Sequence, residues 1–468
     1  MSIKIPNDVF DILKQLNDNG YEAYIVGGAV RDIFLQNKPH DWDITTNATP
    51  DEVKSIFKKT IDTGLKHGTV TAMINHEGYE ITTYRIDGEY EDNRRPSNIE
   101  FTTDLSKDLE RRDFTFNAMA MDKDGNIVDI YNGRTDLTNK IVKAVGNPEK
   151  RIQEDALRML RAIRFSAKYG YEIDKDLYNA IKNNAHLIQN VSYERIENEV
   201  TKILTSGHPE KFLELYNLGL TKYIMPEFDV LMNTPQNTPW HIYNVGMHTM
   251  KAVEQIDNDK NLRWAMLLHD MGKPACKSTD DKGQDHFYDH PVKSTEIADK
   301  ILKRFKFSTK DMEEIKKLVY YHDIHYKKMN KIRKFVAKEG IDFCNKLIKV
   351  QYADISSQSN YKYEEKVNNI EYLNNKIQEV YNDKTAITLK DLKISGNDLI
   401  EIGFKGKEIG EILNTFYNDA LSNPNSNNEK SLKQRAKTIF NNTHKLDDII
   451  KQNTKEQEQK IIDSDIIR

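Results

Sequence analysis

The spacing of hydrophobic and polar residues changes near residue 140. Before that point, short apolar runs typical of strands alternate with short amphipathic segments, whereas afterwards the helical period dominates. The first amphipathic segment, residues 7–19, ends at Gly20 and predicts a helix with one apolar side. Its apolar residues are Phe10, Ile12, Leu13 and Leu16. The pattern predicts an α+β region followed by a remainder that is almost entirely helical.

Within the first 140 residues, the pattern predicts strands, a hairpin and a capped helix. Residues 49–52, Thr-Pro-Asp-Glu, form a capping box with proline at the first helical position. Two apolar runs on either side of residues 76–78 are typical of a hairpin. The predicted strands cover residues 21–26, 41–45, 69–74, 79–85 and 127–130.

The composition favours a globular protein of several domains. The chain has 468 residues, 38% of them hydrophobic, and we find no run of eighteen apolar residues that could span a membrane. Its first residues lack the apolar core of a secretory signal, and Cys276 and Cys344 alone cannot build a disulfide framework. We therefore expect a cytoplasmic protein. The net charge is 69 minus 73, or −4, so any nucleic acid must bind local basic patches such as residues 151–164 and 325–338.

A glycine pair, an arginine and two aspartates follow one another between residues 27 and 43. Gly27 and Gly28 end a predicted strand and open a helix, where a backbone without Cβ atoms lets an anion approach free N–H groups. Arg31 adds a cation, and Asp41 and Asp43, two apart on a predicted strand, point to the same face. Converging carboxylates suit Mg²⁺, which commonly bridges substrate phosphates. Each feature alone is common at surface turns, but together they predict metal-assisted nucleotidyl transfer.

This arrangement resembles the catalytic motif of class II tRNA nucleotidyltransferases and bacterial poly(A) polymerases. Four further segments are similar to the remaining motifs of that family, in the same order. They are Arg111-Arg112-Asp113, residues 129–137, Glu154-Asp155-x-x-Arg158 and residues 192–204. The resemblance implies a multidomain fold, with an α+β nucleotidyltransferase head of the polymerase-beta type over residues 1–140 and an all-α neck over residues 141–205.

The resemblance also implies how the nucleotide is chosen. Asp155 accepts and Arg158 donates hydrogen bonds, which complements the amino group and ring nitrogen of cytosine and adenine and opposes uracil and guanine. Their spacing predicts that both lie on one helix face. Arg161 and Arg164 continue that row as cations for phosphate or sugar, and Arg112 is assigned to the triphosphate or to holding the pocket. An ordinary surface ion pair is the alternative interpretation.

The charged segment 86–98 is similar to the flexible loop of family members that add all three nucleotides. This favours addition of C, C and A to tRNA from CTP and ATP. A disordered surface loop is the alternative interpretation of the segment. An A-adding enzyme or a poly(A) polymerase, which share the motifs, remain open as alternatives for the activity.

A second group of histidines and aspartates lies in the helical half of the chain. An adjacent His-Asp pair ends an apolar helix, and further histidines and a late aspartate flank it. One histidine on an apolar helix is usually a core residue, but this order resembles the ligand pattern of the HD phosphohydrolase superfamily. The expected metal ligands are His248, His269, Asp270, His290, His322 and Asp354.

Imidazole and carboxylate ligands without cysteine suit first-row divalent metals or Mg²⁺, so the identity of this metal stays open. The resemblance implies a phosphodiesterase or phosphatase, with 2′,3′-cyclic phosphates and 2′-nucleotides among its substrates. It also allows Lys273 to neutralise developing charge. A degenerate HD domain retained as a scaffold is the alternative.

The remaining domains are predicted as a helical connector over residues 206–235, the HD domain over 236–360 and a helical tail over 361–468 that would bind tRNA. A polar, breaker-rich linker is predicted at residues 421–431. The expected partners are tRNA, ATP and CTP, with no membrane and no obligatory protein partner. The alternative from another class is an RNA phosphohydrolase whose head only docks RNA.

Overall fold

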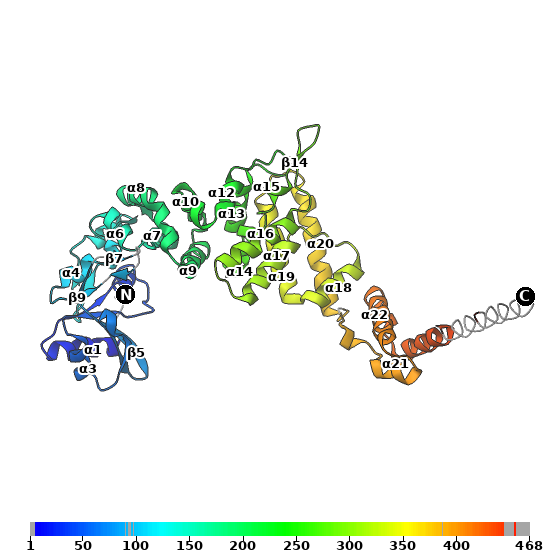
Figure 1. The fold of residues 1–468 in the computed structure, drawn as a ribbon, viewed down its shortest axis with the longest axis horizontal. Coiled ribbons are helices and arrows are strands. Elements are labelled where there is room, and N and C mark those ends of the chain that lie inside the picture. The colour runs from blue at the N-terminus through cyan, green and yellow to red at the C-terminus, as the bar shows by residue number, and fades with distance from the viewer. Residues whose placement is uncertain are drawn as a thin grey trace, which may run out of the picture. The chain divides into compact units, whose positions relative to one another are not determined.

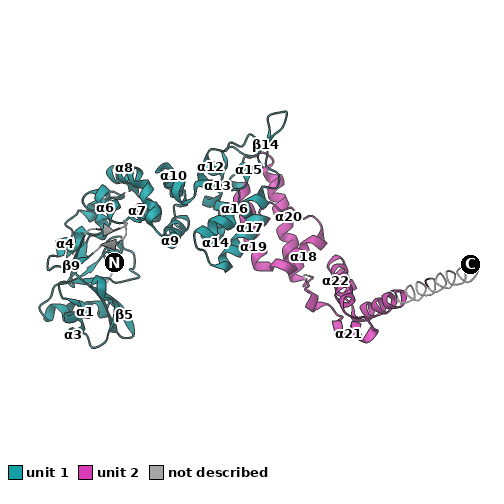
Figure 2. Ribbon diagram, in the orientation of Figure 1, with its two compact units in different colours: residues 1–320, 356–359 teal, residues 321–355, 360–468 magenta. Residues whose placement is uncertain are grey.

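A computed structural model describes residues 5–88, 90–91, 95–96, 98–385, 387–443 and 454. The chain divides into two compact units, shown in different colours in Figure 2. The first unit is residues 1–320 with 356–359, and the second is residues 321–355 with 360–468. Most strands belong to the N-terminal part of the chain, and helices dominate the rest (Figure 1).

A seven-stranded sheet forms the centre of the head. Its order is β11-β10-β1-β2-β5-β4-β3, and the pair β2–β5 is parallel while the other pairs are antiparallel. The strands are β1 (Ala23–Val26), β2 (Ile44–Thr46), β3 (Thr60–Gly64), β4 (Thr69–Ile74), β5 (Glu77–Thr83), β10 (Ala120–Met121) and β11 (Ile127–Val128). The predicted hairpin is confirmed as β4 and β5. The predicted capping box opens α3 (Pro50–Ile56).

Helix α1 (Asn7–Asp18) confirms most of the predicted amphipathic pattern. Its buried residues follow the spacing i, i+3, i+4, i+7 of a single helix face. They are Val9, Ile12, Leu13 and Leu16. Phe10, which we predicted on that face, is 37% exposed. The reason is geometric, because at about 100° per residue Phe10 lies outside the arc that the four buried residues share.

The neck consists of helices and one pair of short parallel strands, β12 (Ile141–Val142) and β13 (Glu172–Ile173). The expectation of an all-α neck is therefore correct except for this pair. A break at residues 155–157 separates the first two neck helices. The neck helices are α6 (Pro148–Glu154), α7 (Arg158–Tyr169), α8 (Lys175–Asn184) and α9 (Tyr193–Leu204).

The neck shares a core with the helices that follow it in the first unit. Trp264, on α14 (Lys260–Leu268), is fully buried, and its Nε1 donates to Thr201 Oγ1 on α9 at 2.9 Å. Tyr193 packs edge-on against Phe305, with ring centroids 5.5 Å apart. Three more helices of this region are α13 (Val245–Gln255), α16 (His290–Arg304) and α17 (Thr309–Tyr321).

The regular secondary structure of the second unit is helical in its described residues, with turns and loops between the helices. Its longer helices are α18 (Met329–Glu339), α19 (Ile341–Ser356, whose last residue is assigned to the first unit), α20 (Tyr363–Asn382) and α22 (Lys407–Ser422). The breaker-rich segment predicted as a linker forms a short turn with one 3₁₀ helix, Pro424–Ser426. Phe416 before this turn and Leu432 after it are buried in one apolar cluster, so the turn joins two packed helices.

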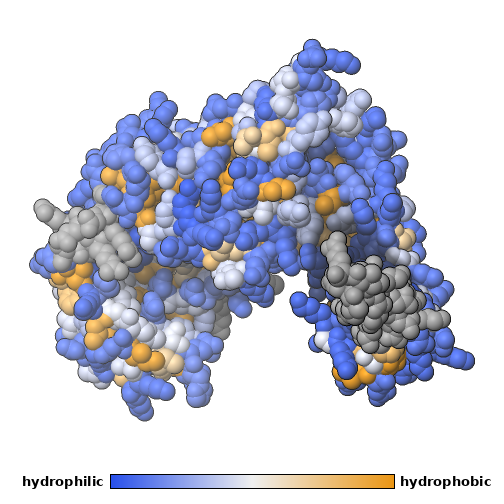
Figure 3. All heavy atoms as spheres, turned by 45° about the vertical axis from the view of Figure 1, so that its right-hand side comes forward, coloured by the Kyte–Doolittle hydropathy of each residue, from blue (hydrophilic) through white to orange (hydrophobic). Residues whose placement is uncertain are grey.

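Hydrophilic residues cover most of the face seen in Figure 3, and hydrophobic residues appear there in small patches. Among the described residues, no helix combines the length and the apolar character needed to cross a lipid bilayer.

Candidate active sites

The glycine pair lies where β1 meets α2 (Gly28–Phe34). Gly27 has φ +68°, a conformation that L side chains rarely adopt, and a Cβ there would lie 3.1 Å from Arg112 Nη1. Only glycine therefore satisfies both the backbone and the close approach of the arginine. The predicted role of this pair, a backbone that a ligand can approach closely, is compatible with this geometry.

The two aspartates lie just before β2 and not on it. The strand begins at Ile44, although the Asp43 carbonyl already accepts from Val26 N at 3.0 Å. The predicted strand over residues 41–45 is thus wrong in its first part, because the described pairing of β2 with β1 ends at Ile44. Desolvation raises the pKa of Asp43, Arg112 opposes that shift, and the nearby Asp41 adds to it. Repulsion between the Asp41 and Asp43 carboxylates is expected where two such groups converge. A divalent cation bound to both would relieve this repulsion.

A cavity of about 370 Å³ opens beside these residues, between the head and the neck. Its lining consists of Gly27, Gly28, Arg31, Asp43, Arg111, Arg112, Asp113, Asn117, Asp155, Arg158, Arg161 and Phe165. Five arginines face three aspartates there, so the lining favours an anionic ligand. Seven predicted site residues converge on it: Gly28, Arg31, Asp43, Arg112, Asp155, Arg158 and Arg161. Asp41 and Arg164 are not among the lining residues.

Arg31 is held from several sides. Its Nη1 donates to Asn117 Oδ1 at 2.6 Å, and its Nε and Nη2 donate to Asp32 Oδ1 at 3.0 and 2.9 Å. Its guanidinium also lies over the rings of Phe165 and Tyr169, 5.2 and 5.6 Å from the centroids. An arginine fixed in this way is preorganised for a phosphate group.

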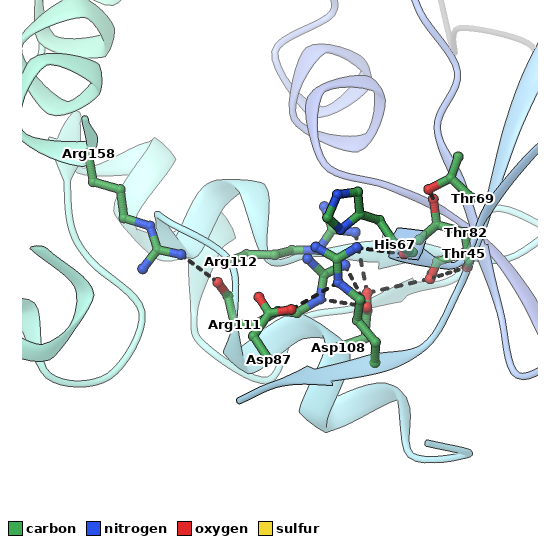
Figure 4. A network of polar contacts seen from close by, with 10 residues as sticks. Thr45, His67, Thr69, Thr82, Asp87, Asp108, Arg111, Arg112 and Arg158 are labelled. Carbon is green, nitrogen blue, oxygen red and sulfur yellow. Dashed lines mark hydrogen bonds and ion pairs between the residues drawn. The ribbon is translucent and has the colours of Figure 1, made fainter. Parts of the chain in front are cut away.

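Asp108, on α4 (Leu105–Glu110), organises the two arginines of the second motif (Figure 4). It is fully buried and binds Arg111 Nη2 at 2.8 Å and Arg112 Nη2 at 3.4 Å. Burial alone would raise the pKa of Asp108, but the two guanidinium groups bring it below its usual value. Thr45 Oγ1 lies 3.4 Å from the same carboxylate and donates to Thr82 O at 3.1 Å. Sequence analysis missed Asp108, although its i+3 and i+4 spacing to the arginines is the signal of such a pair.

The predicted base-reading pair comes from two helices and not from one face of a single helix. Asp155 is the C-cap of α6, and Arg158 is the first residue of α7. Arg195 Nη2 on α9 lies 3.1 Å from Asp155 Oδ2, a partner that the sequence analysis missed although it lies in the last motif. Arg158 donates to Glu154 Oε2 at 2.7 Å and to the carbonyls of Arg151 and Arg111, each at 2.9 Å.

The other two arginines of the predicted row point to different partners. Arg161 Nη2 lies 2.5 Å from Asp113 Oδ2 and also lines the cavity. Burial would raise the pKa of Asp113, but Arg161 and hydrogen bonds, including one from Asn117, lower it to about 2. Arg164 instead pairs with the buried Glu199 at 2.6 Å. Arg161 and Arg164 do lie three residues apart on α7, as predicted. However, Arg164 contacts Glu199 on α9 and does not line the cavity.

The segment 86–98 is described only in part. β6 (Arg85–Asp87) pairs with β9 (Ile99–Phe101), and β7 (Tyr90–Glu91) pairs with β8 (Arg95–Pro96). Residues 89, 92–94 and 97 lie outside the described residues. The link between this loop and addition of three nucleotides stays a prediction.

The second site lies among α13, α14 and α16. Three imidazole Nε2 atoms converge on one carboxylate: His248 at 3.4 Å and His269 at 3.1 Å from Asp270 Oδ2, and His290 at 3.4 Å from Oδ1. Lys273 Nζ lies 2.7 Å from Asp270 Oδ2 and 2.8 Å from Gln236 Oε1. All these side chains are buried. Four predicted ligands therefore meet in the first unit.

The hydrogen bonds of the imidazoles fit a metal centre. His269 Nδ1 lies 2.7 Å from the carbonyl of Met266, and His290 Nδ1 lies 2.9 Å from that of Phe287. A carbonyl only accepts, so each Nδ1 carries a proton, and in a neutral ring this leaves the Nε2 lone pair directed toward Asp270. Lone pairs that face a buried carboxylate are compatible with a cation between them, as in metal sites whose imidazoles donate their other N–H to an oxygen.

The last two predicted ligands belong to the second unit. His322 follows α17 directly and is buried, whereas Asp354 lies on α19 and is half-buried. Their participation in the metal site stays a prediction.

Three family models match the chain. They are described as "Poly A polymerase head domain", over residues 23–143, "Probable RNA and SrmB- binding site of polymerase A", over residues 170–232, and "HD domain", over residues 240–358. The first covers the sheet and the cavity's head residues, and the last covers the imidazole site.

Curated relatives are named CCA-adding enzymes. The protein of Ligilactobacillus salivarius is 33% identical over 435 residues, which are 92% of this chain and 95% of that protein. The protein of Lactobacillus helveticus is 49% identical over 217 residues, or 46% of this chain and 54% of that protein.

Solved structures share the fold. The CCA-adding enzyme of Bacillus stearothermophilus, crystallised with CTP, is 27% identical with a TM-score of 0.68, and the match covers 94% of this chain and 98% of that one. The CCA-adding enzyme of Thermotoga maritima complexed with tRNA is 18% identical with a TM-score of 0.54, over 93% and 95% of the two chains. This second likeness concerns the fold alone.

Proposed function

Since the chain belongs to the family of CCA-adding enzymes, we propose that it adds C, C and A in turn to the 3′ end of tRNA, using CTP and ATP. We further propose that its imidazole site is a metal-dependent phosphohydrolase that acts on 2′,3′-cyclic phosphates and 2′-nucleotides. The observation that carries the first proposal is the cavity where Arg31, Arg112, Asp43, Asp155 and Arg158 meet.

The cavity can hold each part of a nucleoside triphosphate. Arg31 and Arg112 lie on the head side and suit the phosphates, because both are fixed guanidinium groups with donors in a planar fork. Arg158 uses three of its five N–H groups in the hydrogen bonds described above, so two can donate to a base. Asp155 can accept from the amino group of cytosine or adenine, whereas uracil and guanine present a carbonyl there.

The reaction forms a bond between the tRNA 3′-oxygen and the α-phosphorus and breaks the bond to pyrophosphate. The 3′-hydroxyl loses its proton to solvent, and pyrophosphate leaves with the negative charge that Arg31 and Arg112 would stabilise. Mg²⁺, held by Asp41 and Asp43, would supply Lewis-acid activation of the hydroxyl and the phosphoryl group.

The hydrolytic proposal is supported by the three buried imidazoles of the first unit that gather around Asp270. Water would add to the phosphorus of a 2′,3′-cyclic phosphate, one ribose P–O bond would break, and the released ribose oxygen would take the proton. A divalent metal at His248, His269, Asp270 and His290, with the predicted His322 and Asp354, would supply an activated hydroxide.

The test of nucleotide addition is incorporation on three tRNA transcripts that end before CCA, after the first C and after CC. Each transcript is offered CTP, ATP or both, with Mg²⁺. We expect C, C and A in order and then a stop. Addition of A only to the transcript ending in CC would indicate an A-adding enzyme, and long A tails on any RNA would indicate a poly(A) polymerase. Both results would contradict the proposal.

The second activity needs its own matched variants. We expect Asp41→Ala to abolish incorporation and leave hydrolysis of 2′,3′-cyclic AMP intact, and His269→Ala to do the reverse. Hydrolysis without any incorporation by the unmodified protein would favour an RNA phosphohydrolase with a docking head.

A further inference from the structure

The segment just before α16, whose first residue is His290, carries a tyrosine that is exposed and yet fixed. Tyr288 is 71% exposed, and it precedes the buried His290 by two residues. Its ring stacks on that of His286, with centroids 5.4 Å apart and an interplanar angle of 4°. The Tyr288 hydroxyl lies 3.4 Å from His286 Nδ1, and His286 Nε2 lies 3.1 Å from Asp280 Oδ2. The imidazole therefore stacks on the ring with an offset, and most of the tyrosine side chain stays open to solvent.

The segment that carries this ring is tied to the site. His286 ends a hairpin of β14 (Ser278–Thr279) and β15 (Asp285–His286). Asp285 N donates to Asn237 O at 2.9 Å, and Asn237 N donates to Asp285 Oδ2 at 2.8 Å. The neighbouring Gln236 accepts from Lys273, which also binds the carboxylate at the centre of the site. The aromatic pair is therefore held by the same loop that contacts the polar centre.

The backbone that carries the ring lies close to the backbone of one predicted ligand. Consecutive Cα atoms are about 3.8 Å apart, so the Cα atoms of Tyr288 and His290 lie within about 7.6 Å of each other. Asp289 between them has φ +59°, in the left-handed region, and so bends the chain just before α16. A phosphate at the imidazole site and a base against Tyr288 can thus belong to the same residue of a substrate.

We propose that Tyr288 is a base-stacking platform of the hydrolytic site, which makes its substrate a nucleotide, free or at an RNA 3′ end, and not a simple phosphate ester. This inference rests on the proposed phosphohydrolase activity. Every base has a π face, so such a platform binds bases with little regard to their identity. An exposed ring that His286 already orders loses little freedom when a base stacks on it.

The test compares Tyr288→Ala with Tyr288→Phe on three substrates. They are uridine 2′,3′-cyclic phosphate, an RNA oligonucleotide with a 2′,3′-cyclic end, and propane-1,2-diol cyclic phosphate, which has no base. Uridine is chosen because the head pair opposes uracil. We expect Tyr288→Ala to raise KM about tenfold for the substrates with a base, at nearly constant kcat, and to leave the base-free ester unchanged. Tyr288→Phe keeps the ring and should stay within about twofold of the unmodified protein.

The outcomes distinguish a free nucleotide from an RNA end. They also distinguish failure of the platform proposal from failure of the phosphohydrolase proposal. A larger KM for both uridine and RNA assigns the platform to the terminal nucleotide, and a larger KM for RNA alone assigns it to an RNA end. Unchanged KM values, or an equal rise for the base-free ester, would overturn the platform. If the unmodified protein with added divalent metal hydrolyses none of the three, the phosphohydrolase proposal fails. Calorimetric binding of uridine 2′-phosphate to the same variants then decides the platform, and equal Kd values would refute it.

Discussion

The cavity of the head and the imidazole site offer contrasting surroundings to a ligand. The head cavity is open, holds about 370 Å³ and is lined by five arginines and three aspartates. At the other site, the side chains of His248, His269, Asp270 and His290 are at most 11% exposed and already contact one another. The head cavity leaves room for a large anion among its guanidinium groups, whereas the side chains of the second site are buried and lie close together. The difference teaches that the two candidate sites suit different ligands. The open cavity suits a large anion, and the buried cluster suits a small cation.

Removal of divalent metals should give the largest effect and should expose this contrast. Chelation is expected to abolish both activities. Added Mg²⁺ should restore incorporation at once, because exposed oxygen ligands suit this ion, whereas hydrolysis should need Mn²⁺ or Co²⁺ at the imidazoles. Assays of both activities on one chelated sample measure the difference. Recovery of both with Mg²⁺ alone would remove the distinction between the sites.

Removing one carboxylate charge from either site should give the second largest loss of activity. Asp43→Asn should lower incorporation by about a thousandfold or more, since several kcal/mol of metal-assisted stabilisation is lost, and leave hydrolysis unchanged. Asp270→Asn is the matched variant, with the opposite expectation. Rates of both reactions for both variants provide the measurement, and loss of both activities in either variant would mean that the sites are coupled.

The buried Asp113–Arg161 pair predicts a pH-dependent contribution to stability. The pKa of Asp113 is lowered from 3.8 to about 2, so the pair stabilises the fold fully above the unfolded pKa and loses this as pH falls toward 2. Asp113→Asn should cost about 2 kcal/mol at pH 7, and its difference from the unmodified protein should shrink between pH 4 and pH 2. Urea unfolding at several pH values, followed by hydrogen exchange of head peptides, tests this. A difference that does not depend on pH would assign the loss to packing.

The smallest predicted effect concerns Arg195, which holds Asp155. Arg195→Ala should lower the preference for CTP and ATP over UTP and GTP by about tenfold, because a charge-assisted contact of that size orients the accepting carboxylate. Competition assays with nucleotide mixtures measure it. A general loss of incorporation at constant selectivity would show that Arg195 only supports the helices.

Local sequence patterns predicted which residues of the head and neck converge, but not on which helices these residues lie. Gly28, Arg31 and Asp43 were predictable because short spacing and a strand-to-helix turn fix their positions. The break at residues 155–157, Asp-Ala-Leu, was not, because it contains neither glycine nor proline and tertiary packing decides it. Arg164 followed the predicted helical period, yet Glu199, 35 positions away, captured it.

The imidazole site was predictable for a different reason. His269 and Asp270 are adjacent, so any helix end brings them together, and the order of the other histidines supplied the rest. The oxygens that fix the imidazoles are main-chain carbonyls of Met266 and Phe287, which leave no trace in side-chain identity. The clustering of these four side chains could thus be predicted, but the tautomers of the imidazoles could not.

The contact of the Trp264 indole shows that the segments matched by separate family models do not fold separately. Family descriptions treat the segments ending at residue 232 and beginning at residue 240 as separate modules. Yet Trp264, in the later module, is fully buried and donates to Thr201 of the earlier one. A gene truncated between these modules would encode a polypeptide that exposes to solvent the surface against which the indole packs. Recombination at that junction, in nature or in the laboratory, must exchange both sides of the contact together.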